Sequence, residues 1–409
     1  MTRPRLILIS NPKCGDSQGH IFVRQHVLPL LEQHAIHIDK QVVTTGPGHA
    51  ASEFLEFIGH CSDQLSLVRV SLVLASGDGT LHEIVDAVYN SRSIPPRLQV
   101  SVALVPTGTA NALYSSQFPI AQSQAAGTTS VDYKLASIKS LVRNQGNTVP
   151  LTITKATILS PSRAVVSVHF STVVTSTALH ASILHDSESL RDQIPDLSRF
   201  KTAAEKNISR WYPGTVSFRA PQDDELTIYD HRADKFVQFA GDNNNTTEPT
   251  VHGPFSYFIS TVNVDRLEPS FVISPLYSRI PPRRSAMDIT MIRPCRDPTI
   301  QARSEDDHVR FAKKVGMALH AAYRDGAHVT LDFLADGSVN EGGGGSGLLS
   351  LVEYVRCTGS WHWLNVREYD IFLPHNELVC LDWNGTCSSL HRRDNCNYRC
   401  WRAGRMSDY

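Results

Sequence analysis

The chain has 409 residues, of which 41% are hydrophobic and 19% charged, with a formal net charge of -1. This length allows two or three domains with a sizeable core. The near-neutral charge gives no electrostatic reason to expect a nucleic-acid or acidic-membrane partner. The first residues show no secretory signal pattern, and no segment has the length of a membrane span. We therefore expect a cytoplasmic protein without a nucleic-acid partner, in which any lipid contact is peripheral.

The first third of the chain alternates between apolar runs and segments with helical spacing. Residues 6–9, 42–43, 71–75 and 100–105 are predicted strands, and residues 21–31 and 49–58 are predicted helices. This alternation predicts a Rossmann-like α/β domain over residues 1–145, with a parallel sheet and helices on both faces. Glycine-bearing loops follow several strands at their carboxyl ends, where open α/β sheets bind their ligands.

After residue 145 the pattern becomes rich in β-strands. Pro, Gly, Asn and Asp separate predicted strands at 151–159, 164–174, 215–218, 226–229, 236–239, 255–260, 289–292 and 329–333. This predicts a second domain over residues 146–382, an antiparallel β-sandwich, which helical patterns at 178–209 and 304–324 interrupt.

Residues 383–409 are predicted to be an irregular tail, because they are rich in Cys, Arg and Asn and have no apolar period. We favour a wrong splice choice over a genuine tail as their origin. The nearby cysteines Cys380, Cys387, Cys396 and Cys400 form no Cys-x-x-Cys pair, so unbound thiols are favoured over zinc. The scattered cysteines of the remaining chain suit reduced thiols.

Three loops carry the chemistry of the first domain. They are Asn11-Pro12-Lys13-Cys14-Gly15, Ser76-Gly77-Asp78-Gly79-Thr80 and Pro106-Thr107-Gly108-Thr109-Ala110-Asn111. A glycine-bearing loop that opens a helix offers backbone N–H groups and a positive dipole end to phosphate. None of them is a Walker A loop, which would need Gly-Lys-Ser or Gly-Lys-Thr. Taken singly, each loop is equally well explained as a tight turn between strand and helix.

Taken together, the three loops resemble the catalytic domain of the diacylglycerol kinase, sphingosine kinase and ceramide kinase family. The resemblance includes His82-Glu83 after the middle loop and extends over residues 5–382, most clearly over 5–120. It implies ATP and Mg²⁺ as cofactors and a lipid substrate. The implied ATP-contacting residues are Asn11, Pro12, Lys13, Gly15, Thr44, Thr45, His49, Ser76, Gly77, Gly79, Thr80, Glu83, Thr107, Gly108, Thr109 and Asn111.

Phosphoryl transfer to an alcohol needs the phosphoryl group held in line, its charge neutralised, and a carboxylate near the acceptor proton. By resemblance, Asp78 is the catalytic base. Glu83 either holds Mg²⁺ through water or is a solvated first-turn residue that the helix dipole favours. Lys13 is equally open to interpretation as a phosphate contact or a surface lysine. Asp382 is the second expected metal residue, although the glycine and acid expected after it are replaced by Trp383-Asn384-Gly385.

The acceptor segment departs from the family. Ser182 stands where sphingosine and ceramide kinases carry an aspartate, and Asp186 lies one turn later. A serine cannot pair with the ammonium of a sphingoid base. The substrate is therefore a neutral lipid alcohol, or Asp186 takes over the contact. Glu188 and Arg191 are interpreted as an exposed helix pair.

The leading hypothesis is thus an ATP-dependent kinase for a sphingoid base, ceramide, diacylglycerol or related lipid alcohol. Its lipid pocket would be lined by Phe170, Leu179, Ile183 and Leu184, which are otherwise core residues. Two alternatives stay open: a NAD kinase-like enzyme, and a non-catalytic protein that binds nucleotide or lipid. The sequence does not indicate an oligomeric state.

Overall fold

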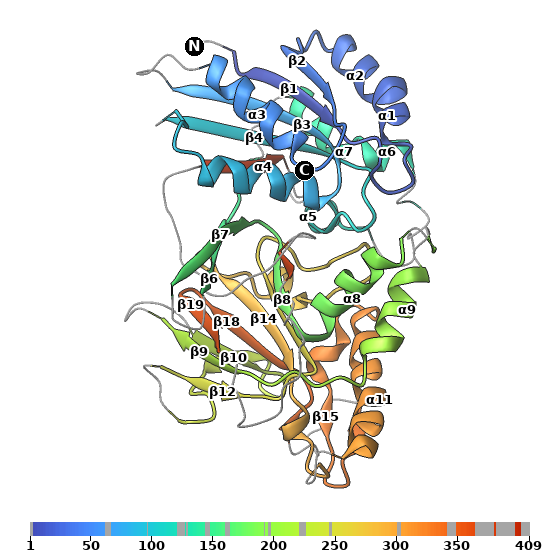
Figure 1. Cartoon of the computed structure of the whole chain (residues 1–409), viewed down its shortest axis with the longest axis vertical. Coiled ribbons are helices and arrows are strands. Elements are labelled where there is room, and N and C mark those ends of the chain that lie inside the picture. Colours follow the sequence, from blue (N-terminus) through green and yellow to red (C-terminus); the bar gives the residue numbers. More distant parts are fainter. Residues whose placement is uncertain are drawn as a thin grey trace, which may run out of the picture.

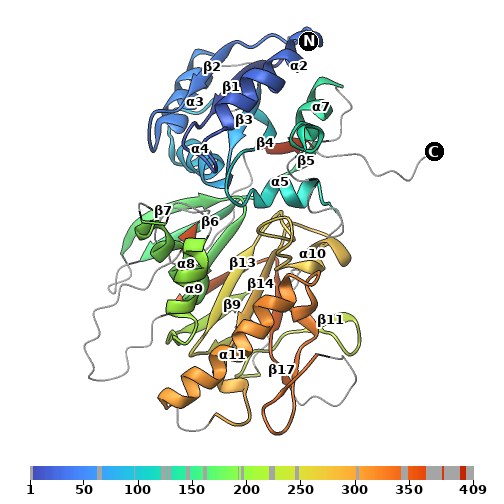
Figure 2. The same cartoon turned by 90° about the vertical axis from the view of Figure 1, so that its right-hand side faces the viewer.

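In a computed structural model, the chain forms two domains stacked along its long axis (Figures 1 and 2). The structure describes residues 3–61, 67–95, 97–120, 127, 130–143, 148–159, 164–191, 193–194, 198–220, 226–244, 248–300, 304–341, 349–364, 380–381 and 397–401.

The first domain is built on a six-stranded sheet. Its strand order is β2-β1-β3-β4-β21-β5, and β1 to β4 are parallel. The strands that correspond to the predicted ones are β1 (Arg5–Ser10), β2 (Lys40–Val43), β3 (Val68–Ser76) and β4 (Leu98–Pro106). The parallel sheet predicted from the alternation is therefore confirmed.

Helices cover both faces of this sheet, because the buried side chains of each strand alternate between two cores. Ile7 and Ile9 pack on one face with α3 (His49–His60) and α4 (Asp78–Asn90). Leu6 and Leu8 pack on the other face. That second face is covered by α1 (Gly19–Phe22), a π-helical turn (Val23–Val27), α2 (Leu28–Gln33) and α7 (Ala136–Val142). The remaining helices of this domain are α5 (Ala112–Gln117) and α6 (Val131–Lys134).

Between β4 and the edge strand of the sheet lies a strand that the sequence did not predict. β21 (Asn397–Trp401) pairs parallel with β4 and antiparallel with β5 (Thr148–Pro150). These five residues fall in the segment expected to be irregular, and for them that expectation is wrong. The physical reason is tertiary: the edge of β4 offers unpaired backbone groups, and a segment distant in sequence can pair with them without an apolar period of its own.

The second domain is dominated by antiparallel sheets. A seven-stranded sheet has the order β11-β10-β18-β14-β13-β8-β20, and a three-stranded sheet has the order β12-β9-β19. Phe218, Phe258 and Trp361 belong to one buried cluster, which includes residues of both sheets. The larger sheet contains β8 (Val174–Thr177), β10 (Leu226–Asp230), β11 (Lys235–Gln238), β13 (Tyr257–Thr261), β14 (Met287–Ile292), β18 (Glu353–Cys357) and β20 (Cys380–Leu381).

The smaller sheets complete this domain. The three-stranded sheet contains β9 (Thr215–Arg219), β12 (Thr250–His252) and β19 (Ser360–Leu364). The chain enters the domain through a separate antiparallel pair, β6 (Thr154–Leu159) and β7 (Val165–Ser171). A last sheet joins β15 (Asp332–Phe333), β16 (Val339–Asn340) and β17 (Leu349–Ser350).

Two predicted elements of the second domain differ in the structure. The helical pattern at 178–209 gives two helices, α8 (Ala178–Ser189) and α9 (Ser198–Asn207). Pro195 lies between them in the sequence, and a proline disfavours the helical conformation of the residue before it. The strand predicted at 329–333 is wrong in its first part, where a 3₁₀ turn (Ala327–Thr330) follows the left-handed Gly326 and precedes β15.

The remaining helices are α10 (Pro275–Arg279) and α11 (Glu305–Ala322), which begins with a Ser304–Asp307 capping box. Within the residues that the structure describes, none of the helices combines the length and apolarity needed to span a bilayer.

Candidate active site

The three glycine-bearing loops meet at the carboxyl ends of β1, β3 and β4. The N–H of Asn11 donates to the carbonyl of Ala75 at 3.0 Å, and its side-chain Nδ2 donates to Thr80 Oγ1 at 3.4 Å. The N–H of Gly77 donates to the sulfur of Cys14 at 3.1 Å. These bonds join the first two loops directly, as expected for neighbouring strands of a parallel sheet.

The glycines of these loops also allow the backbones to touch. A Cβ placed on Gly108 would lie 2.4 Å from the Cα of Gly77. At Gly15, whose φ is +56°, a Cβ would lie 2.3 Å from the carbonyl oxygen of Thr107. No side chain fits at such distances, so the packing of the loops by itself requires glycine at these positions. The packing of the loops is therefore a sufficient structural explanation for these glycines.

Asp78 begins α4 and lies between the second and third loops. Its side chain is buried, at 7% exposure, and its carboxylate accepts two backbone N–H groups of α5. Oδ2 accepts from Ala112 at 2.7 Å and Oδ1 from Leu113 at 3.1 Å. The negative charge thus lies at the positive end of a neighbouring helix, which stabilises it. Asp78 therefore has a structural role, which does not exclude a second one, because a carboxylate offers about four acceptor sites.

The third loop is held in shape by Asn111. This residue has a left-handed φ of 54°, its Oδ1 accepts the N–H of Gly108 at 2.9 Å, and its Nδ2 donates to the Gly108 carbonyl at 2.7 Å. Asparagine tolerates this backbone conformation better than other residues with a Cβ. Because this closed turn precedes α5, Asn111 helps to present the two amides that Asp78 accepts.

Three hydroxyl groups of the second and third loops are buried. The hydroxyls of Ser76 and Thr80 hydrogen-bond to each other at 2.6 Å. Thr107 is buried, and its Oγ1 has no hydrogen-bond partner among the described residues. A buried hydroxyl without a partner costs free energy. A bound nucleotide that reached Thr107 Oγ1 would remove this cost, so the loops fit the phosphates that the resemblance implies.

A second group of predicted residues lies beside the first, between β2 and α4. His49 Nδ1 accepts the N–H of Thr45 at 3.0 Å, so in the neutral ring the proton is on Nε2, which lies 3.2 Å from Glu53. The N–H of Gly48 donates to Glu83 Oε2 at 3.2 Å. Burial raises the pKa of Glu83, and the bond from Gly48 opposes this shift. Glu83 therefore connects the loop before α3 to α4.

The other predicted nucleotide residues differ in exposure. Thr44 is buried, and its N–H donates to the Ser10 carbonyl at 2.9 Å. Lys13 and Gly15 are exposed, whereas Pro12, Gly79 and Thr109 are partly buried. Lys13 is thus placed to contact either a ligand or solvent.

The expected metal residues are only partly described. Glu83 lies in the second group, and Asp382 lies outside the described residues. Across the described ranges, no group of three or more His, Cys, Asp or Glu side chains forms a metal site by itself.

The predicted acceptor residues lie together on α8, and both have partners. Ser182 is buried, and its Oγ hydrogen-bonds to the hydroxyl of Tyr212 at 2.8 Å. Asp186 accepts from Asn207 at 2.9 Å and pairs with Lys206 at 2.9 Å. Burial opposes ionisation of Asp186, but the hydrogen bonds from Asn207, Lys206 and His185 prevail and lower its pKa to about 2. Asp186 therefore fastens α8 to α9.

The apolar candidates for the lipid pocket lie mainly in the core. Phe170 and Leu179 are buried, and Phe170 stacks on Tyr89 with ring centroids 4.9 Å apart. Ile183 is partly buried, and Leu184 packs with Ala181.

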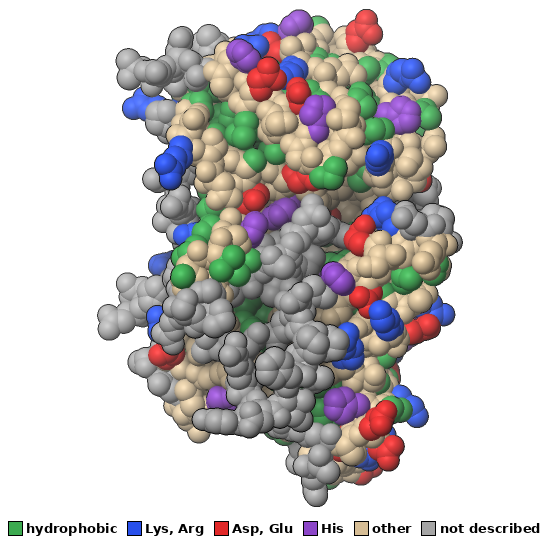
Figure 3. All heavy atoms as spheres, in the orientation of Figure 1, with side chains coloured by type: hydrophobic (Ala, Val, Ile, Leu, Met, Phe, Trp, Pro, Cys, Tyr) green, Lys and Arg blue, Asp and Glu red, His purple; other side chains and the backbone are tan. Residues whose placement is uncertain are grey.

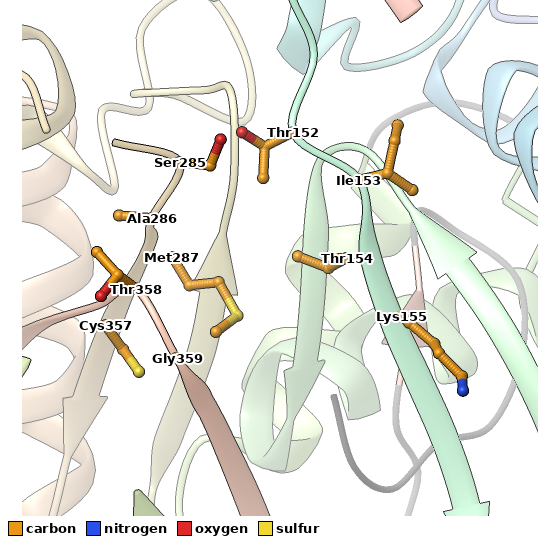
Figure 4. A pocket seen from close by; sticks show the side chains of 10 residues that line it. All are labelled: Thr152, Ile153, Thr154, Lys155, Ser285, Ala286, Met287, Cys357, Thr358 and Gly359. Carbon is orange, nitrogen blue, oxygen red and sulfur yellow. The ribbon is translucent and has the colours of Figure 1, made fainter. Parts of the chain in front are cut away.

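A separate small cavity lies beside the start of β6, where Thr154 and Met287 point toward each other (Figure 4).

Glu188 and Arg191 form the exposed pair that was predicted, at 2.9 Å.

Three residues that contact the candidate site or its elements were not among the predicted site residues. Cys14 accepts the Gly77 N–H, Tyr212 pairs with Ser182, and Asp86 on α4 contacts β7. Cys14 stands inside the first loop, so its position was available as a signal. Tyr212 and the partners of Asp86 are distant in sequence, and no local pattern indicates such contacts.

Comparisons with known proteins agree with this geometry. Residues 5–139 match the diacylglycerol kinase catalytic domain. Human sphingosine kinase 2 is 28% identical over 111 residues, and sphingosine kinase B of Dictyostelium discoideum is 30% identical over 112 residues. Each alignment covers 27% of this chain but only 16% and 14% of the respective relative.

The whole chain resembles a solved structure in fold. A proposed diacylglycerol kinase from Bacillus anthracis strain Sterne superposes with a TM-score of 0.51 at 13% identity, covering 98% of this chain and 95% of the other. At this identity the likeness establishes the fold of both domains. Together, the matched segment and the three joined loops lead to one conclusion: residues 5–139 of this chain belong to the diacylglycerol kinase catalytic-domain family.

Proposed function

We propose that this protein is an ATP-dependent lipid kinase that phosphorylates a hydroxyl group of a lipid alcohol. The observation that carries the proposal is the meeting of three glycine-bearing loops around the buried carboxylate of Asp78. This combination supplies backbone N–H groups for phosphate and one acid for the acceptor, within a domain of a lipid-kinase family.

In the proposed reaction, the acceptor oxygen forms a bond to the γ-phosphorus of ATP while the bond to the β,γ-bridging oxygen breaks. The proton of the acceptor hydroxyl passes to Asp78 and then to solvent. A carboxylate is a weak base for an alcohol, but a loose transition state demands little proton transfer before bond formation. Most of the acceleration then comes from positioning. Mg²⁺ would neutralise phosphate charge, with Glu83 holding it through water.

The contacts made by α8 support a proposal for the class of acceptor. Ser182 is engaged with Tyr212, and Asp186 is engaged with Lys206 and Asn207. Neither supplies an uncompensated carboxylate for the ammonium of a sphingoid base. We therefore propose a neutral lipid alcohol, of the diacylglycerol or ceramide type, as a better acceptor than sphingosine. The Ser182–Tyr212 hydroxyl pair can donate to and accept from a neutral head group.

The test is transfer of radiolabelled phosphate from ATP to a panel of sphingosine, ceramide, diacylglycerol and NAD in detergent micelles. We expect a labelled product with diacylglycerol or ceramide, and a loss of at least about 100-fold in kcat for Asp78→Asn. Asp132→Asn is the matched control, because Asp132 is exposed and pairs with Lys139 at 2.7 Å. Equal turnover by wild type and Asp78→Asn would remove Asp78 from the reaction, and phosphorylation of NAD alone would establish the NAD kinase alternative.

The non-catalytic alternative is supported by one specific observation. Both oxygens of Asp78 already accept N–H groups of α5, so a chain that had lost catalysis would still keep this acid for structure. This alternative expects nucleotide binding without turnover. Isothermal titration with ATP and with a non-hydrolysable analogue, beside the lipid panel, separates the two: binding with no labelled product from any acceptor favours the non-catalytic protein.

A further inference from the structure

The helix that begins with Asp78 also makes a contact between the two domains. In both views α4 lies next to β7, the strand through which the chain passes into the second domain (Figures 1 and 2). Acidic and histidine side chains gather along this boundary on the face that Figure 3 shows. Asp86, two turns after Asp78, is the acid through which α4 holds β7.

The carboxylate of Asp86 has partners on both sides of the boundary. Its Oδ1 accepts the backbone N–H of Phe170 at 2.7 Å and Asn90 Nδ2 at 3.0 Å. Its Oδ2 lies 3.4 Å from His169 Nδ1. A carboxylate can only accept, so Nδ1 of His169 carries a proton, and in the neutral ring its Nε2 accepts from the hydroxyl of Ser167 at 3.1 Å. The side chains of Asp86 and His169 are 23% and 28% exposed, so water competes weakly for this contact.

Two further contacts make the same connection. Asn90 Nδ2 also donates to the carbonyl of Val168 at 3.2 Å, and the ring of Tyr89 stacks on Phe170. Three successive residues of β7 are thus bound by one turn of α4. Because backbone groups of β7 take part, the contact fixes the path of the strand and not only its side chains.

This contact affects the site because β7 leads toward the acceptor helix. The chain continues from Phe170 through β8 directly into α8, which carries Ser182. Asp78 therefore lies at one end of α4, and the segment that leads to the acceptor helix is fastened near the other end. A rigid helix of this kind transmits position over its length, so a shift at Asp86 changes the separation between Asp78 and α8.

We infer that Asp86 is a positioning residue that fixes the second domain against α4 and thereby sets where an acceptor hydroxyl meets Asp78. The inference deepens the proposed function and rests on it for its kinetic consequence. Its structural part, the fixing of the domains, stands on the contacts alone. A second contact between the domains, in which Ser116 Oγ accepts the N–H of Asp265 at 3.1 Å, is independent of Asp86. Variants of Asp86 are therefore expected to stay folded.

The experiment compares Asp86→Ala, Asp86→Asn and the control Asp132→Ala. In Asp86→Ala the Phe170 amide loses its acceptor, so hydrogen exchange measured by mass spectrometry in a peptide covering residues 165–171 should rise at least about tenfold. Small-angle scattering should reveal a broader distribution of distances between the domains. Asp86→Asn keeps Oδ1 for the Phe170 amide and should resemble wild type in both measurements.

In the kinetic arm, kcat of Asp86→Ala should fall about 10- to 100-fold with the KM for ATP within about twofold of wild type. Asp86→Asn should recover most of kcat. The inference is overturned if Asp86→Ala turns over like Asp132→Ala, if its loss appears in the KM for ATP, or if Asp86→Asn is as impaired as Asp86→Ala. A wild type that phosphorylates no lipid would contradict the proposed function, while exchange and scattering still decide whether Asp86 fixes the domains.

Discussion

The carboxylate of Asp78 accepts the backbone N–H of Ala112 at 2.7 Å, although the two residues are 34 positions apart in the chain. A residue expected to serve only the acceptor hydroxyl also caps a neighbouring helix. The two roles are compatible because both use the charged carboxylate, one through the amides of α5 and one through the substrate proton. A substitution of Asp78 should therefore change both the stability of the protein and the proposed reaction.

Asp78→Asn should destabilise the protein as well as slow the proposed reaction. The amide NH₂ of asparagine would face one of the two α5 N–H groups, leaving a buried donor unsatisfied at a cost of about 1–3 kcal/mol. Chemical unfolding followed by circular dichroism checks this value. Asp132→Asn, which removes an exposed pair, should stay within about 0.5 kcal/mol of wild type. If the two variants were equally stable, the capping role of Asp78 would be wrong.

Gly108→Ala should separate the second and third loops. The added Cβ would lie 2.4 Å from the Cα of Gly77, and backbone cannot yield as a flexible side chain does. We expect a loss of several kcal/mol or weakened ATP binding, measured by unfolding and by titration calorimetry. Gly59→Ala is the matched control: it lies inside α3 with nothing within 4 Å of its Cβ, so it should gain about 0.5–1 kcal/mol. Normal ATP binding by a stable Gly108→Ala protein would mean that the close approach of the two loops does not require glycine.

Asp186 should contribute stability at neutral pH and lose it in acid. Its pKa is lowered to about 2 from 3.8, so the folded protein holds the ionised form more strongly than the unfolded chain does. The stabilisation is complete above pH 4 and disappears as the pH falls toward 2, with a total of about 1–2 kcal/mol. Unfolding of wild type and Asp186→Asn at several pH values should therefore converge in acid. A difference that persists unchanged at the lowest accessible pH would assign Asp186 another role.

Because of His328, the protein should lose stability as the pH falls from 6.5 to 4. Burial lowers its pKa from 6.5 to about 4, although its Nε2 bonds to the Ile273 carbonyl at 3.1 Å. In this window the unfolded chain binds a proton that the folded protein does not, so stability falls as pH falls, by up to about 3 kcal/mol. His180 has the same direction, with a pKa of about 4 caused by burial.

The variant His328→Gln tests this assignment. It should reduce the slope of stability against pH in the window by one proton, about 1.4 kcal/mol per pH unit, whatever its stability at pH 7. Differential scanning calorimetry at half-unit steps gives the slope. An unchanged slope would mean that His328 is protonated when folded, or that other groups control this range.

The sequence alone determined the parallel sheet, the three glycine-bearing loops and the order of the two domains, since these depend on local apolar period and on turn residues such as Gly77 and Asn111. The exposed pair of Glu188 and Arg191 could also be predicted, because the two residues lie close together along the chain. Such features depend on near neighbours in the sequence.

Only the tertiary structure decided which partners these residues have. In the structure Asp78 accepts hydrogen bonds from α5, Asp186 pairs with α9, and Asp86 accepts a hydrogen bond from β7. β21 pairs with β4. These partners are separated by tens to hundreds of residues, and a contact of this kind depends on how elements pack, which leaves no periodic signal in the sequence. The residues of the candidate site could therefore be predicted from the sequence, whereas the structural contacts that each side chain makes could not.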